Sequence, residues 1–289
     1  MIDLSVKAAG SALCAACMCK TECDLIVKDL LEKGADANFC ANEGLSPLFI
    51  ASYYGHKKII QLLLKYGADV NSKINNRYPP LSVSLLKERT VRAVKFKVIV
   101  DFEYLYNTTV FSPLFAACYK GYTEIVQLLL ENDADVNTRG NFGIGLIFMH
   151  CQIDNNSLND HSLDLFSFEG SCPLFAACYN KNIEILTLLL EKAADVNYFP
   201  KSFFTFSVTG QRKFKIEFYG ISLLYEACQN KQNRIAEVLI ENGADVNFCS
   251  EECGTPLHAA CESKNYIIVE LLLKNDANIN LSSETVSYT

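Results

Sequence analysis

The chain has 289 residues, of which half are apolar and a fifth are charged, so it can bury a core and is not a disordered chain. Its formal net charge is −7 and its pI is about 5.2, and an acidic surface disfavours binding to nucleic acid. No apolar run reaches the roughly 20 residues that a membrane-spanning helix needs. Its thirteen cysteines, an odd number, favour a reducing compartment, and we expect the cytoplasm, with the nucleus as the alternative.

An apolar segment near the N-terminus has two interpretations. The run 8–19, between Lys7 and Lys20, loosely resembles a secretory signal. It is rich in small residues and poor in leucine, however, and it falls in register with the repeat described next. We therefore favour a repeat helix.

Two short markers recur along the chain with one period. The first is Pro-Leu, with the proline at positions 47, 80, 113, 173 and 256, and with Leu223 in the same place in one further unit. The second is Ala-Asp-Val-Asn or a near variant, which closes at Asn38, Asn71, Asn137, Asn197, Asn247 and Asn280. Both markers repeat at 33 residues, and both lengthen to 60 and then to 50 residues at the same two junctions. They therefore mark one repeating unit.

The repeating unit resembles the ankyrin repeat. Its start reads Thr-Pro-Leu-His at 255–258 and Ser-Pro-Leu-Phe at 46–49 and 112–115. The resemblance covers nearly the whole chain and implies an all-α repeat solenoid of paired antiparallel helices with β-hairpin fingers. We expect a single domain, 1–289, of about seven repeats at approximately 11–43, 44–76, 77–109, 110–142, 170–199, 220–252 and 253–285.

Each part of the unit has a physical reason. Before the helix, a hydroxyl side chain can accept a backbone hydrogen bond and cap it, at Ser46, Ser112 and Thr255. The second helix is aliphatic on one face and closes on a glycine, as at Gly67, in the left-handed conformation. Three other units replace that glycine, and we expect strained helix ends at Asp133, Ala193 and Asp276.

The segment 77–109 is a degenerate repeat. It keeps Pro80, Leu81 and the 33-residue spacing, but it lacks the glycine and the Ala-Asp-Val-Asn string. Valines such as Val91 and Val94 can still supply an apolar face. We expect this repeat to be helical but poorly packed, the weakest link of the stack.

Two insertions, at approximately 143–169 and 200–219, fall where the ankyrin repeat places its fingers. The second alternates apolar residues on both sides of a turn, which predicts strand, turn and strand, at Phe204, Phe206, Val208, Phe214, Ile216 and Phe218. The first has a vaguer pattern that fits a long hairpin or a partly disordered loop. Three interpretations of an apolar finger stay open: a partner-binding patch, packing against neighbouring repeats, or translated non-coding sequence.

The sequence predicts no catalytic residue, no metal site and no cofactor. Of the four histidines, His56 and His258 stand at common positions of the repeat, and the other two show no partner pattern. No phosphate loop, nucleophile elbow or His-Glu-x-x-His string is present. The dense group Cys14, Cys17, Cys19 and Cys23 is suggestive of zinc, but helical spacing does not bring all four around one ion. One cysteine per repeat instead follows an alanine, which predicts small buried residues, at Cys17, Cys118, Cys178, Cys228 and Cys261. Aspartates such as Asp135 recur once per repeat and are read as turn residues.

The resemblance implies a non-enzymatic scaffold or adaptor that binds a protein partner through the concave helix face and the fingers, and we expect a monomer. The predicted partner-binding residues lie on the exposed side of the first helix of each repeat: Tyr53, Tyr54, Tyr119, Lys120, Tyr179, Asn180, Gln229 and Glu262. The alternative for the tyrosines is that they only cover the helix groove. The alternative function is the recognition part of a larger protein, such as a channel, kinase or ubiquitin-ligase subunit; a redox or enzymatic module is a third hypothesis.

Overall fold

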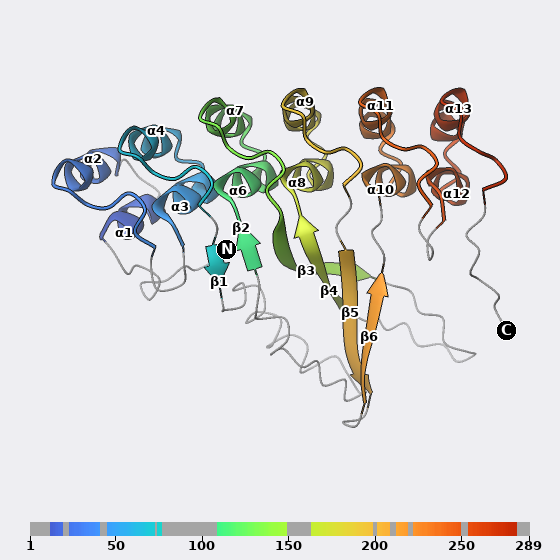
Figure 1. The fold of residues 1–289 in the computed structure, drawn as a ribbon, viewed down its shortest axis with the longest axis horizontal. Helices are drawn as coiled ribbons and strands as arrows, with labels where there is room; N and C mark the ends of the chain where they lie inside the picture. Colours follow the sequence, from blue (N-terminus) through green and yellow to red (C-terminus); the bar gives the residue numbers. More distant parts are fainter. Residues whose placement is uncertain are drawn as a thin grey trace.

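A row of helix pairs forms the molecule (Figure 1). The computed structural model describes residues 12–19, 23–40, 45–72, 74–76, 109–148, 163–198, 201–208, 212–218, 222–249 and 254–281. In these ranges the inner helices are α1 (Ala12–Met18), α3 (Pro47–Tyr54), α6 (Pro113–Lys120), α8 (Pro173–Tyr179), α10 (Leu223–Gln229) and α12 (Pro256–Glu262). The outer helices are α2 (Asp24–Glu32), α4 (Lys57–Lys65), α7 (Thr123–Glu131), α9 (Ile183–Glu191), α11 (Asn233–Glu241) and α13 (Tyr266–Lys274).

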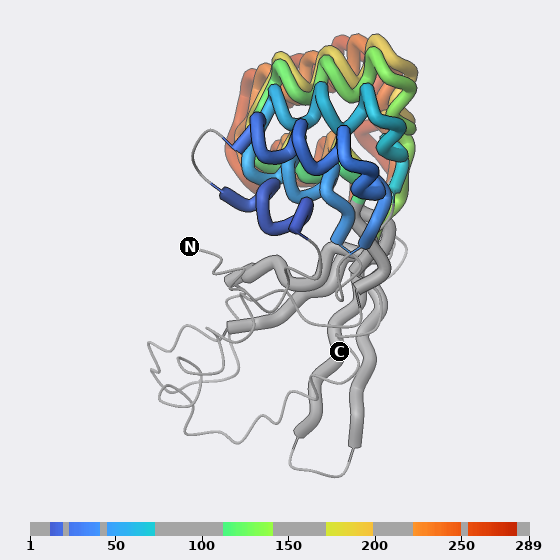
Figure 2. The backbone as a smooth tube through the Cα atoms, turned by 90° about the vertical axis from the view of Figure 1, so that its left-hand side faces the viewer, coloured from blue at the N-terminus to red at the C-terminus, as the bar shows by residue number. Residues whose placement is uncertain are grey.

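The core lies between the inner and outer helices and between successive pairs. Seen along the row, the pairs stand one behind another in two layers (Figure 2). Leucines fill the interior, and alanines such as Ala51 and Ala117 are fully buried where inner helices approach one another. A helix of seven to nine residues is too short to be stable alone, so each pair depends on this packing.

The helix starts follow the expected capping pattern. The Ser46 and Ser112 hydroxyls accept backbone hydrogen bonds from Phe49 and Phe115 at 3.2 and 3.1 Å. The Thr255 hydroxyl accepts one from the His258 amide at 3.3 Å. The prediction of capping at all three positions is confirmed, and proline follows each cap at the first helical position.

The ends of the outer helices adopt the left-handed conformation. Gly67 has a φ of 81°. Three non-glycine residues in the equivalent position also have positive φ, namely Asp133 at 63°, Ala193 at 61° and Asp276 at 61°. The predicted strain is thus present, because a side chain in this region crowds the backbone.

An asparagine after each outer helix links one pair to the next. The Asn137 side chain donates to the Ala193 carbonyl oxygen at 3.2 Å and accepts from the Asp195 amide at 2.8 Å. Its own amide donates to the Asp135 carboxylate at 2.9 Å, as expected for turn aspartates. The same pair of bonds recurs along the row from Asn38, Asn71, Asn197 and Asn247.

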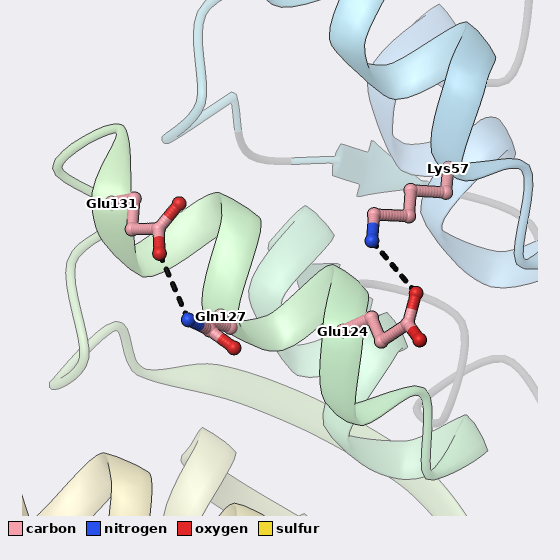
Figure 3. A network of polar contacts seen from close by, with 4 residues as sticks. All are labelled: Lys57, Glu124, Gln127 and Glu131. Carbon is pink, nitrogen blue, oxygen red and sulfur yellow. Dashed lines mark hydrogen bonds and ion pairs between the residues drawn. The ribbon is translucent and has the colours of Figure 1, made fainter.

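The row passes directly from α3 and α4 to α6 and α7. The Asn71 side chain bonds to the Asp133 oxygen at 3.1 Å and the Asp135 amide at 2.7 Å. On the outer side, Lys57 of α4 meets Glu124 of α7 at 2.7 Å, while Gln127 and Glu131 pair within α7 (Figure 3). Adjacent units that share these bonds leave no place for another pair between them.

This arrangement differs from the expected stacking of the segment 77–109. Residues 77–108 lie outside the described residues. The strands that flank them, β1 (Ile74–Asn76) and β2 (Thr109–Phe111), pair as a short antiparallel ladder in the position of a finger. The physical reason is that this segment has no Ala-Asp-Val-Asn turn: Tyr104 stands 33 residues after Asn71, where the turn asparagine would bond a neighbouring unit.

The two insertions form β-hairpins. β3 (Gly140–Phe148) pairs with β4 (Leu163–Ser171), and β5 (Lys201–Val208) pairs with β6 (Arg212–Phe218). The register sets Phe204 opposite Ile216, so the two alternating runs predicted from the sequence are in phase. β4 also pairs with β5, which joins both hairpins into one four-stranded sheet below the helices (Figure 1). The side chains of these strands lie outside the described residues, so the open interpretations of their apolar faces stay predictions.

The segment near the N-terminus belongs to the row. Ala12–Met18 is the inner helix α1, and Leu13, Cys14 and Cys17 are buried within the core. The repeat interpretation of these residues is therefore confirmed.

Relief of the left-handed strain should stabilise the protein. Ala193→Gly is expected to raise the free energy of unfolding by about 0.5–1 kcal/mol, because glycine accepts a positive φ without crowding. Gly67→Ala, in the equivalent position, should lower it by about 1 kcal/mol; a methyl group there has no neighbour within 4 Å, so only the backbone contributes. Urea unfolding followed by circular dichroism measures both, and a less stable Ala193→Gly protein would contradict this account.

Removal of the Asn71 side chain should leave a backbone amide in the turn of the next unit without its hydrogen-bond acceptor. Asn71→Ala takes away the oxygen that accepts the Asp135 amide, so hydrogen exchange at that amide should accelerate about five- to tenfold. Asn137→Ala is the matched control: it should accelerate exchange at Asp195 and leave Asp135 unchanged. Unchanged exchange of Asp135 in Asn71→Ala would mean that these two units are not direct neighbours.

Candidate binding surface

Three tyrosines occupy one position near the end of successive inner helices. The buried stripe of each helix uses its earlier residues, for example Leu114 and Ala117 of α6, which leaves the last turn at the surface. Tyr53 and Tyr119 are half-buried, whereas Tyr179 is 60% exposed. The structure thus gives the predicted position a graded exposure along the row.

The tyrosine rings form a connected aromatic surface. Tyr53 stacks on Phe49 and Tyr119 on Phe115, one turn earlier in the same helix, with centroid distances of 6.2 and 6.3 Å. Tyr119 also stacks on Tyr179 of the next inner helix, at 6.3 Å between ring centroids. Such ring pairs add about 0.5–1.5 kcal/mol beyond burial. Tyr53 and Tyr119 therefore pack over their own helices while keeping part of their surface open, and Tyr179 leaves most of its surface open.

Lys120 places its ammonium group over the rings of Tyr53 and Tyr119. Its Nζ lies 4.1 Å from the centroid of the Tyr53 ring and 5.8 Å from that of Tyr119. Burial raises the pKa of the Tyr53 hydroxyl. Burial and then the neighbouring Tyr179 raise the pKa of Tyr119, while Lys120 lowers it. The result is an exposed cation held over aromatic rings, a contact worth about 0.5–1 kcal/mol at the surface.

The other predicted residues divide into two groups. Tyr54 and Asn180 make contacts within the protein: Tyr54 stacks on His56 at 6.0 Å, and the Asn180 amide donates to the main-chain oxygens of Tyr119 and Cys118. Gln229 and Glu262 are exposed, and their side chains have no hydrogen bond or ion pair with any described residue. The tyrosines, Lys120 and Asn180 are therefore brought together, and Gln229 and Glu262 stand apart on α10 and α12.

A groove that the sequence analysis missed lies between α8 and α10. It has a volume of about 230 Å³ and is lined from α8 and its following turn by Phe175, Tyr179 and Lys181, and from α10 by Glu226, Ala227 and Asn230. Glu226 stands where other inner helices carry Ala116, Ala176 or Ala259. That single acid in a row of alanines is the sequence signal for the groove.

The recurring cysteines are packing residues. Cys17, Cys118, Cys178 and Cys228 are at most 6% exposed, as predicted. Burial raises the pKa of each of these thiols, which keeps them neutral and unreactive. Cys261 differs from the prediction and is exposed, because no described helix packs beyond α12.

The cysteines near the N-terminus lie close to one another but differ in burial. Cys14 is buried, with its thiol 3.9 Å from the Leu45 oxygen, whereas Cys19 is exposed and Cys23 half-buried. Across the described ranges, no three His, Cys, Asp or Glu side chains gather as metal ligands would. None of the helices in those ranges has the length and apolarity that membrane crossing requires.

Comparison with known proteins agrees with the fold. A family model for ankyrin repeats (3 copies) matches residues 3–74, 93–199 and 201–283. A putative ankyrin repeat protein of Rickettsia felis is 28% identical over 167 residues, covering 54% of this chain and 44% of the relative. A putative ankyrin repeat protein of fowlpox virus is 29% identical over 179 residues, covering 60% of this chain and 45% of the relative. The chain thus spans less than half the length of these two relatives.

A solved structure shows the same architecture. The crystal structure of the human ASB11 ankyrin repeat domain matches with a TM-score of 0.54 at 21% identity, covering 93% of this chain and 86% of that one. At this identity the likeness is one of fold alone. The family model, by contrast, matches most of the sequence, and it does so over the same helix pairs and asparagine turns described above. The chain belongs to the ankyrin repeat family.

Proposed function

We propose that this chain is a non-enzymatic scaffold that binds a protein partner through the exposed face of its inner helices. Ankyrin repeats are in general protein–protein interaction modules, and the finer proposal names the surface. One observation carries it: the aromatic surface of Tyr53, Lys120, Tyr119 and Tyr179 runs across three successive units and ends in a tyrosine that is 60% exposed. Tyrosine presents a large area and a hydroxyl at low entropic cost, which suits it to interfaces.

The setting of this surface supports the proposal. The inner helices lie on the side of the row from which the strands project (Figure 1), so a partner resting on the tyrosines also meets the fingers. We propose that the protein acts as a monomer in the cytoplasm or nucleus, the compartment that its odd number of cysteines favours.

The alternative is that this chain is the recognition part of a larger protein. The length of the matched relatives favours it, since the chain spans 44% and 45% of them. A full-length transcript separates the two: an open reading frame that continues into another domain supports the alternative.

Exchange of the exposed tyrosine should weaken partner capture. The immobilised chain is used to capture proteins from a lysate, which are identified by mass spectrometry, and the capture is repeated with Tyr179→Ala and Tyr119→Ala. We expect about a tenfold loss of the same partner with either variant, because truncation of an interface tyrosine removes a large contact area. The control is Tyr266→Ala, which removes an 85% exposed tyrosine from the outer helix α13.

The controls make the result decisive. Tyr266→Ala should capture the partner as the unchanged protein does, and unfolding curves show whether Tyr119→Ala, at a half-buried position, remains folded. Unchanged capture by both Tyr119→Ala and Tyr179→Ala would overturn the assignment of this surface.

A further inference from the structure

We propose that the groove between α8 and α10 receives an arginine side chain of the bound protein, with its guanidinium at the Glu226 carboxylate. This inference rests on the proposed function and names the chemistry of the partner at one place on that surface. The size of the groove is the first argument. At about 230 Å³ it lies below the range of roughly 300–1,000 Å³ that small-molecule sites occupy, and it suits one long side chain.

The charge of the groove selects a cation. Glu226 is partly buried on α10, and its carboxylate has no ion pair or hydrogen bond with any described residue. Burial raises the pKa of Glu226, and no nearby cation offsets that rise. Lys181 lines the groove from the turn after α8 but is exposed and forms no ion pair with Glu226 in the described part of the chain. A carboxylate out of water without a counter-ion gains most from a cation that enters beside it.

The remaining walls favour a planar cation. Tyr179 lines the groove and offers an exposed ring, on which a guanidinium stacks better than an ammonium. The Asn230 amide nitrogen donates to the Glu226 main-chain oxygen at 3.1 Å, which leaves the Asn230 side-chain oxygen as an acceptor. Arginine has five N–H donors in one plane, so it can pair with the carboxylate and the amide oxygen together.

Other occupants match these walls less well. An anion is repelled by Glu226, and a metal ion needs several ligands where the groove offers one carboxylate. The neighbouring units do not offer the same chemistry, because alanine occupies the Glu226 position at Ala116, Ala176 and Ala259 and isoleucine at Ile50. The fit to arginine is therefore confined to the junction between the units of α8 and α10.

The direct test uses a model compound, so it does not require the partner. The ¹⁵N-labelled full chain is titrated with N-acetyl-arginine amide, and the backbone amide shifts of Glu226, Asn230 and Lys181 are followed by NMR. We expect saturable shifts at these residues with the arginine compound. N-acetyl-lysine amide should bind with at least about fivefold weaker affinity, and the neutral isostere N-acetyl-citrulline amide should cause no shifts. Absent shifts with the arginine compound, or equal affinity for all three compounds, would overturn the proposal, and equal affinity for lysine would contradict the preference for arginine.

Two variants connect the shifts to the carboxylate. Glu226→Gln removes the charge at nearly constant shape. It should lower the affinity for the arginine compound at least about tenfold, since a charge-assisted hydrogen bond is lost. Glu184→Gln makes the same change at an exposed position on the outer helix α9 and should bind as the unchanged chain does. If Glu226→Gln binds the arginine compound as tightly as the unchanged chain does, the assignment of the guanidinium to the Glu226 carboxylate is wrong.

The same variant shows whether loss of binding is loss of folding. Because burial raises the folded-state pKa of Glu226, its contribution to stability is present at low pH and is lost as the pH rises through that pKa. Glu226→Gln should therefore unfold at higher urea concentration than the unchanged chain at pH 7, and the difference should shrink at pH 4. The other groups on the groove, Cys178, Tyr179 and Lys181, are unchanged between the two proteins. A less stable variant at pH 7 would contradict the unpaired state of this carboxylate.

Partner capture separates this inference from the proposed function. If Tyr179→Ala loses the partner and Glu226→Gln keeps it, the binding surface stands and the arginine assignment fails. If both variants keep the partner, the surface itself is misassigned. Loss of the partner with Glu226→Gln and retention with Glu184→Gln support both.

Discussion

The side chain of one asparagine per repeat decides which helix pairs become neighbours. A pair of short helices cannot bury its apolar face alone, so it needs a partner on each side and a device that sets the distance to that partner. Asn71, Asn137 and Asn197 supply this device, because each both donates to and accepts from the turn of the next pair. Extra sequence between these turns, however long, leaves the row intact as long as both ends return to the same bonds.

The surface of the inner helices follows from that fixed spacing. Because the turns after the outer helices hold a constant register, the last turns of α3, α6 and α8 come to lie side by side. Residues separated by about 60 positions in the sequence, Tyr119 and Tyr179, therefore stack ring on ring. Lys120 adds a positive charge between Tyr53 and Tyr119 to a protein whose overall charge is negative. The proposed binding surface is thus a product of the repeat and does not belong to any one helix pair.

The sequence predicted the features that each repeat carries within itself. Caps such as Ser46, the left-handed Ala193 and the hairpin of the second insertion all depend on a few neighbouring residues. It predicted less well what depends on contact between units. The Pro80 spacing indicated a stacked repeat, yet spacing does not replace the missing asparagine bond. The pairing of β4 with β5 and the groove beside Glu226 arise only when separate insertions or separate helices meet.

The groove is compatible with the fold because two neighbouring units contact each other in two separate places, at the turns after the outer helices and between the inner helices. Between the units of α8 and α10, the Asn197 side chain holds the turns after the outer helices, with bonds of 3.0 and 2.8 Å. The inner helices of the same two units can then stand apart without separating the pairs. Glu226 therefore places a carboxylate where other inner helices pack an alanine. Its burial lowers the stability of the protein, and the asparagine bonds and the shared core offset that loss. Because the asparagine bonds hold the outer side of these two units together, the inner side can carry the carboxylate that we propose as the arginine site.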